Sequence, residues 1–112
     1  MNRAQLIEKL TAWQNGQASA LEIWQWAEAE KSATTQLADA LVRDLLDLLA
    51  AIPYEMIMPE DCAVFLDALA NPLDETDLSV NLLWNHMDMI DADTRRIQAA
   101  DDPFYGQFAE LD

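Results

Sequence analysis

One histidine and one cysteine are present in the chain, and they are the first residues to weigh for catalytic chemistry. His86 is followed by Asp88 and Asp91, and an imidazole among carboxylates can act as a general base or bind a metal. A zinc site needs two or three more nitrogen or sulfur ligands, of which Cys62 could add only one. Two acids directly precede Cys62 and favour its protonated thiol, whereas a nucleophilic cysteine needs a lowered pKa. We therefore expect His86 to be an ordinary surface or boundary residue and Cys62 to be a plain, partly buried thiol.

The acids near the end of the chain resemble part of a calcium-binding loop. A complete EF-hand loop needs oxygen ligands at its first, third and fifth positions, a glycine at the sixth and a glutamate at the twelfth. With Asp91 first and Asp93 third, the fifth and sixth positions are Arg95 and Arg96. The sequence therefore excludes calcium binding of the EF-hand kind.

Other catalytic motifs are missing from the sequence. It contains no Gly-rich phosphate loop, no G-x-S-x-G and no H-E-x-x-H. A glycosidase needs two carboxyl groups in a cleft with aromatic walls, and a small helical domain offers little room for one. We expect no enzymatic activity, no metal and no cofactor.

Charge is the most informative property of the composition. The net charge is −15, which repels nucleic-acid phosphate and anionic lipid headgroups, so neither nucleic acid nor a membrane is expected as a partner. No base occurs between Arg43 and Arg95, and that stretch holds twelve acids. Pairs of opposite charge four residues apart cannot neutralise these acids. Either solvent or a basic protein partner must therefore compensate the negative charge of these acids.

The expected contact residues come from this base-free stretch, together with one tryptophan. Trp26 lies at the edge of a broad apolar arc, where it is either boundary packing or an interface anchor, since tryptophan is enriched among binding hot spots. The predicted partner-binding residues are Asp74, Glu75, Asp77, Asp88, Asp91, Asp93 and Trp26.

The elements that must position these residues are predicted to be helices. The chain has 112 residues, 52% of them apolar, which is enough for one domain with a core. Its two glycines leave little material for tight hairpin turns. We expect a single all-α domain over residues 1–112, a compact bundle of about five helices. The predicted helices are 3–15, 20–31, 35–51, 59–71 and 78–99.

The first two helices have clear boundary signals. Leu6, Leu10 and Trp13 share one helical face. Gly16 stands where a left-handed C-terminal cap is expected. Ser19 and the glutamate three residues later match a capping box. The apolar residues of 20–31 cover an arc of about 220°, which indicates a helix packed on two sides, or packed on one side and open to a partner on the other.

The later helices are bounded by prolines and acids. Pro53 is expected to end the third helix, with an apolar connector over 54–58, and Pro59 to begin the fourth. Ala63, Leu66 and Ala70 are expected to face inward, and Phe65 and Leu69 are further candidates for that face. Val80, Leu83, Trp84, Met87 and Ile90 form the predicted apolar face of the fifth helix. The acids at 91–93 can interrupt that helix, and the aromatic tail over 101–108 is expected to dock on the body.

One pattern along the chain resembles small acidic helical bacterial immunity proteins, which guard a cell against its own colicin-like or contact-dependent toxins. It covers about a quarter of the chain, and the closing arginine pair and aromatic tail are similar to the ends of such proteins. The resemblance implies a helical protein that binds and blocks a toxin domain, and it assigns no individual site residue. The residues that carry it are Leu6, Leu10, Trp13-Gln-Asn-Gly16-Gln-Ala-Ser19, Ile23-Trp24 and Trp26-Ala27.

Two functions remain open from the sequence. The first is a non-catalytic acidic binding protein, such as an immunity or inhibitor protein that neutralises a cationic toxin nuclease, because nuclease clefts carry positive charge for phosphate. The second is a helical adaptor or self-associating subunit whose acidic surface keeps it soluble. A lone cysteine and a start without a secretory pattern favour the cytoplasm.

Overall fold

The computed structural model describes residues 2–33 and 39–108, and over these residues the protein is helical, without a strand. This confirms the predicted all-α class. The described residues form seven α-helices and three short 3-10 helices, more than the five helices predicted. The α-helices are α1 (Arg3–Gln14), α2 (Ala20–Ala33), α3 (Ala40–Leu49), α4 (Ile52–Glu55), α5 (Cys62–Ala70), α6 (Thr76–Met89) and α7 (Ala92–Gln98). The 3-10 helices are η1 (Pro59–Asp61), η2 (Leu73–Glu75) and η3 (Tyr105–Phe108).

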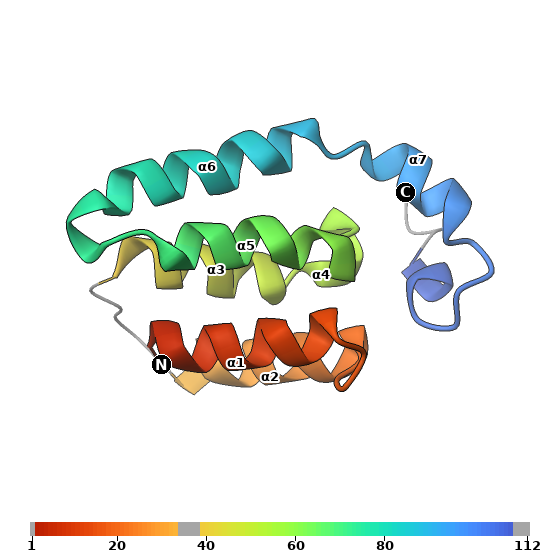
Figure 1. The fold of residues 1–112 in the computed structure, drawn as a ribbon. Coiled ribbons are helices and arrows are strands. Elements are labelled where there is room, and N and C mark those ends of the chain that lie inside the picture. The colour runs from red at the N-terminus through yellow and green to blue at the C-terminus, as the bar shows by residue number, and fades with distance from the viewer. Residues whose placement is uncertain (1, 34–38, 109–112) are drawn as a thin grey trace.

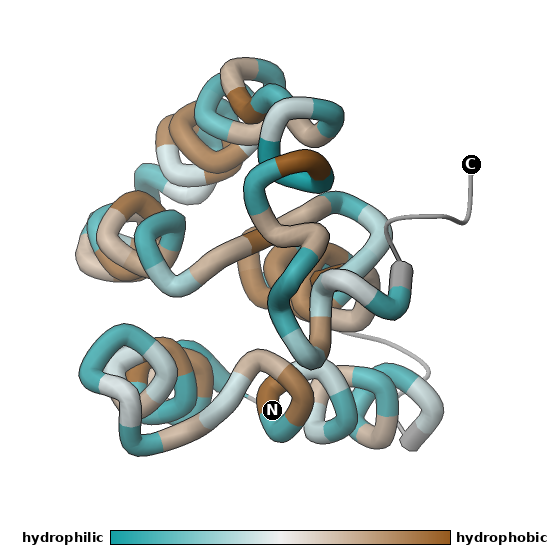
Figure 2. The backbone as a smooth tube through the Cα atoms, turned by 90° about the vertical axis from the view of Figure 1, so that its right-hand side faces the viewer, coloured by the Kyte–Doolittle hydropathy of each residue, from teal (hydrophilic) through white to brown (hydrophobic). Residues whose placement is uncertain are grey.

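The long helices pack in two layers. α5 packs between α1 and α6 in the front layer of Figure 1, and α2 and α3 lie side by side behind it. α3 also packs on α6, which closes the bundle at the top. α7 and η3 lie at one end of the bundle (Figure 1). Each long helix carries both hydrophobic and hydrophilic segments, as the view along the helices shows (Figure 2), and their buried side chains form one core.

The boundary signals of the first two helices are confirmed. Leu6, Leu10 and Trp13 are buried, and Gly16 has the left-handed φ of 77° that its capping position requires. The Ser19 hydroxyl accepts the backbone N–H of Glu22 at 3.1 Å, and the Glu22 carboxylate accepts the Ser19 N–H at 3.3 Å. The capping box therefore starts α2 as its residue types require.

α3 is the most strongly amphipathic element. Asp39 is its N-cap and accepts the Leu41 backbone N–H at 3.1 Å. The predicted start at residue 35 lies outside the described residues. Six apolar residues of α3 are buried: Leu41, Val42, Leu45, Leu46, Leu48 and Leu49.

The segment predicted as a connector contains a further helix. Pro53 is the second residue of the one-turn helix α4, a position in the first turn where its missing N–H costs no hydrogen bond. α4 ends at Met56, which adopts the left-handed φ of 55° and is completely buried. Burial of its side chain offsets the strain that a non-glycine residue has in this conformation.

α5 buries two of the residues named for its inner face, Phe65 and Leu69, but not all of them. Phe65, Ala68 and Leu69 are buried, whereas Ala63 and Ala70 are exposed. Those two predictions are wrong because α5 packs on both α1 and α6, and the large side chains occupy the space between them. Leu66 is partly buried against the core.

The predicted fifth helix is two helices. α6 ends at Met89, Ile90 is extended, and Asp91 caps α7 by accepting the Thr94 N–H at 3.0 Å. The acidic stretch thus interrupts the helix. The tail docks as expected: Tyr105 is buried and its hydroxyl donates to the carbonyl of Ile57. Across the described ranges, no helix combines the length and the apolar character that crossing a membrane demands.

Candidate functional site

The six predicted acids lie together on η2, α6 and α7. Asp74 and Glu75 are in η2, Asp77 and Asp88 are near the two ends of α6, and the last two begin α7. All six are exposed. α6 and α7 form one edge of the molecule, at the top of Figure 1. The helices that contain or are capped by four of the six acids, α6 and α7, therefore lie along one edge of the bundle.

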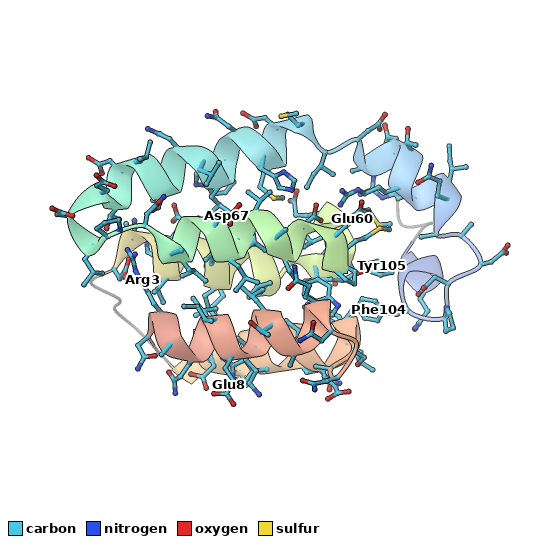
Figure 3. The ribbon with its side chains drawn as sticks, viewed as in Figure 1. Arg3, Glu8, Glu60, Asp67, Phe104 and Tyr105 are labelled. Atoms are coloured by element: carbon cyan, nitrogen blue, oxygen red, sulfur yellow. The ribbon has the colours of Figure 1, made fainter. Side chains whose placement is uncertain are left out.

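Most of the bases in the described part of the chain are engaged away from these acids. Arg3, at the start of α1 in Figure 3, binds the Asp39 carboxylate at 2.7 Å and also donates to Thr76 at 3.1 Å. The remaining ion pairs on the surface are Lys31–Asp47 at 3.3 Å, Arg43–Asp44 at 3.6 Å and Arg96–Asp93 at 3.1 Å.

Five of the six acids consequently have no cationic partner. Within residues 2–33 and 39–108, only Asp93 of the set has a base within 4.0 Å. The Asp91 carboxylate accepts hydrogen bonds from the hydroxyl and the backbone N–H of Thr94, and these bonds lower the pKa of Asp91. Asp74, Glu75, Asp77 and Asp88 are left as exposed carboxylates that the protein itself does not neutralise.

Exposed apolar side chains lie beside these acids on α6, and the sequence analysis did not single them out. Leu78 is 57% exposed, Leu82 is 38% exposed and Met89 is 82% exposed. At 100° per residue these three fall within an arc of about 40°, and the arc of Asp77 and Asp88 begins about 80° away. The four- and seven-residue spacing of Leu78, Leu82 and Met89 could have indicated from the sequence that they share one face of the helix. The neighbouring apolar stripe that contains Leu83 made this second apolar face hard to recognise.

We call this surface the α6 face. It consists of Asp74, Glu75, Asp77, Leu78, Leu82, Asp88, Met89 and Asp91.

Two tryptophans differ from their expected roles. Trp26 belongs to α2, in the layer away from α6, so it is not part of the α6 face. It is partly buried against the core, and the Lys9 ammonium lies 5.5 Å from its ring centroid. Trp84 was predicted on the inner face but is 41% exposed, because its indole N–H reaches over to Asp44 at 3.1 Å.

A buried charged cluster is the second feature that sequence reasoning missed. Asp61 is 1% exposed, and its carboxylate accepts two hydrogen bonds from Arg95, at 2.6 and 3.0 Å. The Nε2 atom of His86 lies 2.9 Å from the same carboxylate. The backbone N–H of Met58 donates to it at 2.8 Å, and Arg95 also donates to the carbonyl of Met56 at 2.9 Å.

The charges of this cluster hold two separate parts of the chain together. Burial alone raises the pKa of Asp61, but the hydrogen bonds from Arg95, Met58 and His86 outweigh it and hold the pKa below its ordinary value. Hydrogen bonding to Asp61 likewise raises the pKa of Arg95. Both groups are therefore charged at neutral pH, and together they fasten α7 to the start of α5.

The thiol next to this cluster is held in its protonated form. Cys62 is completely buried, more so than predicted, and burial followed by the charge of Asp61 raises its pKa to about 12. A thiol in that state is a poor nucleophile. Over the described part of the chain, no three side chains from His, Cys, Asp and Glu gather in a way that could hold a metal ion.

Comparison with known proteins identifies no relative: no family model, no curated protein and no solved structure matches this chain.

Proposed function

We propose that the protein is a non-catalytic binding protein whose α6 face docks on a cationic protein partner. The observation that carries this proposal is the combination of unneutralised carboxylates and exposed apolar side chains on one helix. Among the described residues no base lies within 4.0 Å of the carboxylates of Asp74, Glu75, Asp77 and Asp88. Leu78, Leu82 and Met89 are exposed on α6 near them.

The two kinds of side chain suit different parts of binding. Exposed carboxylates attract a positive surface over a distance and speed the encounter, while their effect falls with salt. Apolar side chains that become buried contribute most of the affinity once the surfaces meet. Asp77 and Asp88 are three helical turns apart, about 16 Å along α6, so the complementary partner surface is a strip.

A toxin nuclease domain fits this chemistry, and the protein would then act as its immunity or inhibitor protein. Nucleases bind phosphate with lysine and arginine, and an acidic helix laid across such a cleft complements that charge. The proposal rests on charge and exposure and on the resemblance of the sequence to small acidic immunity proteins.

Self-association is the alternative function, with the protein as a helical adaptor or subunit. Its motivation was the broad apolar arc of α2, but Trp24 and Trp26 pack partly against the core and Ile23 and Ala27 are buried. A second copy would also bring another net charge of −15 to the interface. A cationic partner is therefore the better match. A stable dimer in sedimentation that the change Trp26→Glu disrupts would favour the alternative.

The experiment begins with capture of partners by the tagged protein from its native cells at about 0.05 M salt. A captured protein is identified, purified and used in stopped-flow association with three forms of this protein. These are the wild type, a face variant (Asp74→Asn, Glu75→Gln, Asp77→Asn, Asp88→Asn) and a control variant (Glu8→Gln, Glu28→Gln, Glu55→Gln, Asp101→Asn). Both variants lose four exposed charges, so they have the same net charge.

The face variant is expected to associate about tenfold more slowly than the wild type at low salt, and the control variant within about twofold of it. The wild-type rate should fall steeply as salt increases. Equal losses in the two variants, or a rate that does not depend on salt, would show that the α6 face is not the docking surface.

A further inference from the structure

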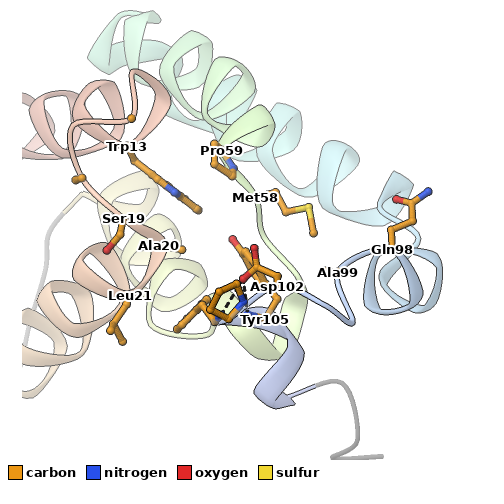
Figure 4. A pocket seen from close by; sticks show the side chains of 14 residues that line it. Trp13, Ser19, Ala20, Leu21, Met58, Pro59, Gln98, Ala99, Asp102 and Tyr105 are labelled. Carbon is orange, nitrogen blue, oxygen red and sulfur yellow. Dashed lines mark hydrogen bonds between the residues drawn. The ribbon is translucent and has the colours of Figure 1, made fainter.

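A cavity of about 640 Å³ opens at the end of the bundle, away from the α6 face and sharing no residue with it. It lies among the α1–α2 turn, the chain before η1, the end of α7 and the segment that leads into η3 (Figure 4). Its volume falls within the range of small-molecule binding sites, about 300–1,000 Å³. The walls are mainly apolar, with Trp13, Leu21, Met58, Ala99 and Tyr105 among them.

Small residues leave this space open. Gly16, Ala18, Ser19 and Ala20 form the wall on the side of the α1–α2 turn. These small residues belong to the turn that joins α1 and α2, in which Gly16 adopts the left-handed backbone conformation. No large side chain from this turn is therefore available to fill the space between Trp13 and the tail.

Trp13 supplies a hydrogen-bond donor that nothing in the protein uses. Trp13 is only 2% exposed, and its indole ring projects into the cavity (Figure 4). Among the described residues no acceptor is found for its indole N–H, whereas the indole of Trp24 donates to the carbonyl of Ala50 at 2.8 Å. Because no buried side-chain nitrogen or oxygen atom lacks a partner there, the Trp13 N–H must be accessible from the cavity, where it can donate to an acceptor atom of a bound group.

Of the described residues that line the cavity, Asp102 alone carries a charge. Its Oδ1 atom accepts the backbone N–H groups of Phe104 and Tyr105 at 2.8 and 3.0 Å, which fixes the carboxylate in place. No base is found in the described part of the lining. A ligand with a positive group is therefore matched by Asp102 and by the aromatic faces near it, while an anion would be repelled.

We propose that this cavity binds a small organic amine with an apolar body, whose ammonium group pairs with Asp102 and whose acceptor atom receives the Trp13 N–H. This site is separate from the proposed docking of a cationic protein on the α6 face. Either proposal can fail without the other.

Three compounds with the same body and different ends test the proposal. Tyramine carries an ammonium, tyrosol a hydroxyl and 3-(4-hydroxyphenyl)propionate a carboxylate, and each phenol oxygen can accept the Trp13 N–H. Each is titrated into the 15N-labelled full chain while the indole N–H resonance of Trp13 is followed by NMR. We expect tyramine to shift this resonance with a Kd of about 1 mM or tighter and to bind about tenfold more tightly than tyrosol, and the carboxylate to bind most weakly.

Two variants distinguish recognition of the ammonium group by Asp102 from nonspecific binding. Asp102→Asn keeps an oxygen for the two backbone N–H groups but removes the charge, so it should abolish the preference for tyramine over tyrosol while tyrosol binding stays unchanged. Asp101→Asn removes a neighbouring exposed charge and should leave the preference intact. The proposal is overturned if the Trp13 resonance does not respond to about 10 mM tyramine, if the three compounds bind equally, or if the two variants lose the preference to the same extent.

Discussion

Asp61 illustrates how much a single residue depends on its surroundings. It is one of the two acids that directly precede Cys62 in the sequence, yet it is buried and faces Arg95 and His86. Glu60, its neighbour, remains largely exposed, with Arg95 3.8 Å away. The pair Asp61–Arg95 connects residues 34 positions apart, which no local pattern reveals.

Removing the charge of Asp61 should destabilise the protein strongly. In Asp61→Asn the partly buried Arg95 guanidinium loses its counter-ion inside the protein, and we expect the free energy of unfolding to fall by about 3 kcal/mol. Urea unfolding measures this change. The matched control is Asp67→Asn, an exposed carboxylate of α5 (Figure 3), for which a change within about 0.5 kcal/mol is expected. Equal effects in the two variants would contradict the role given to the buried pair.

The same residue gives a pH dependence whose direction can be worked out. The pKa of Asp61 in the folded protein is below its unfolded value of 3.8. As the pH falls below about 4 the unfolded chain takes up this proton first, so the contribution of Asp61 is complete above that pH and decreases below it. The difference in unfolding free energy between the wild type and Asp61→Asn should be constant from pH 7 to about pH 5 and shrink below about pH 4. Urea midpoints across this range test it, and a difference that grows as the pH falls would rule it out.

At the scale of elements, the helices with strong local signals form where the sequence indicates. α2 begins at its capping box, and α3 buries the stripe that its leucines define. The errors concern short or two-sided elements. α4 is a single turn held by the burial of Met56, and the inward face of α5 is decided by its two neighbours.

The start of α2 gives a prediction at this scale. Ser19→Ala removes the acceptor of the Glu22 backbone N–H, and we expect a loss of about 1 kcal/mol in the free energy of unfolding. Ser32→Ala, an exposed position near the other end of the same helix, should change stability by a few tenths of a kcal/mol at most. Circular dichroism during urea unfolding compares the two, and similar losses would argue against a stabilising cap.

At the scale of the whole molecule, the charge is distributed unevenly. The two most buried arginines, Arg3 and Arg95, hold internal junctions together, at 13% and 16% side-chain exposure. The excess negative charge is left on the outside, including on the α6 face. This excess charge accounts for the proposed attraction to a cationic partner. It also makes the surface carboxylates of the protein repel one another.

This repulsion predicts a salt effect on stability. Screening weakens it, so the unfolding midpoint should rise when NaCl increases from about 0.05 to 0.5 M, by about 1 kcal/mol in free energy. A variant that combines the face and control substitutions has a net charge of −7, because eight carboxylates of the original −15 become amides. Its salt response should be clearly smaller. A midpoint that falls with salt in the wild type would contradict the prediction.

The sequence alone determined the helical class, the start of α2, the turn at Gly16 and the acidic character of the stretch between Arg43 and Arg95. These depend on residue type and on spacings within one or two helical turns, where neighbours in sequence are neighbours in space. The partners of Asp61, the position of Trp26 away from the acids and the cavity beside Trp13 were decided by the tertiary structure. Each arises where segments distant in sequence meet, and the packing of large side chains there selects which polar groups are buried, paired or left open.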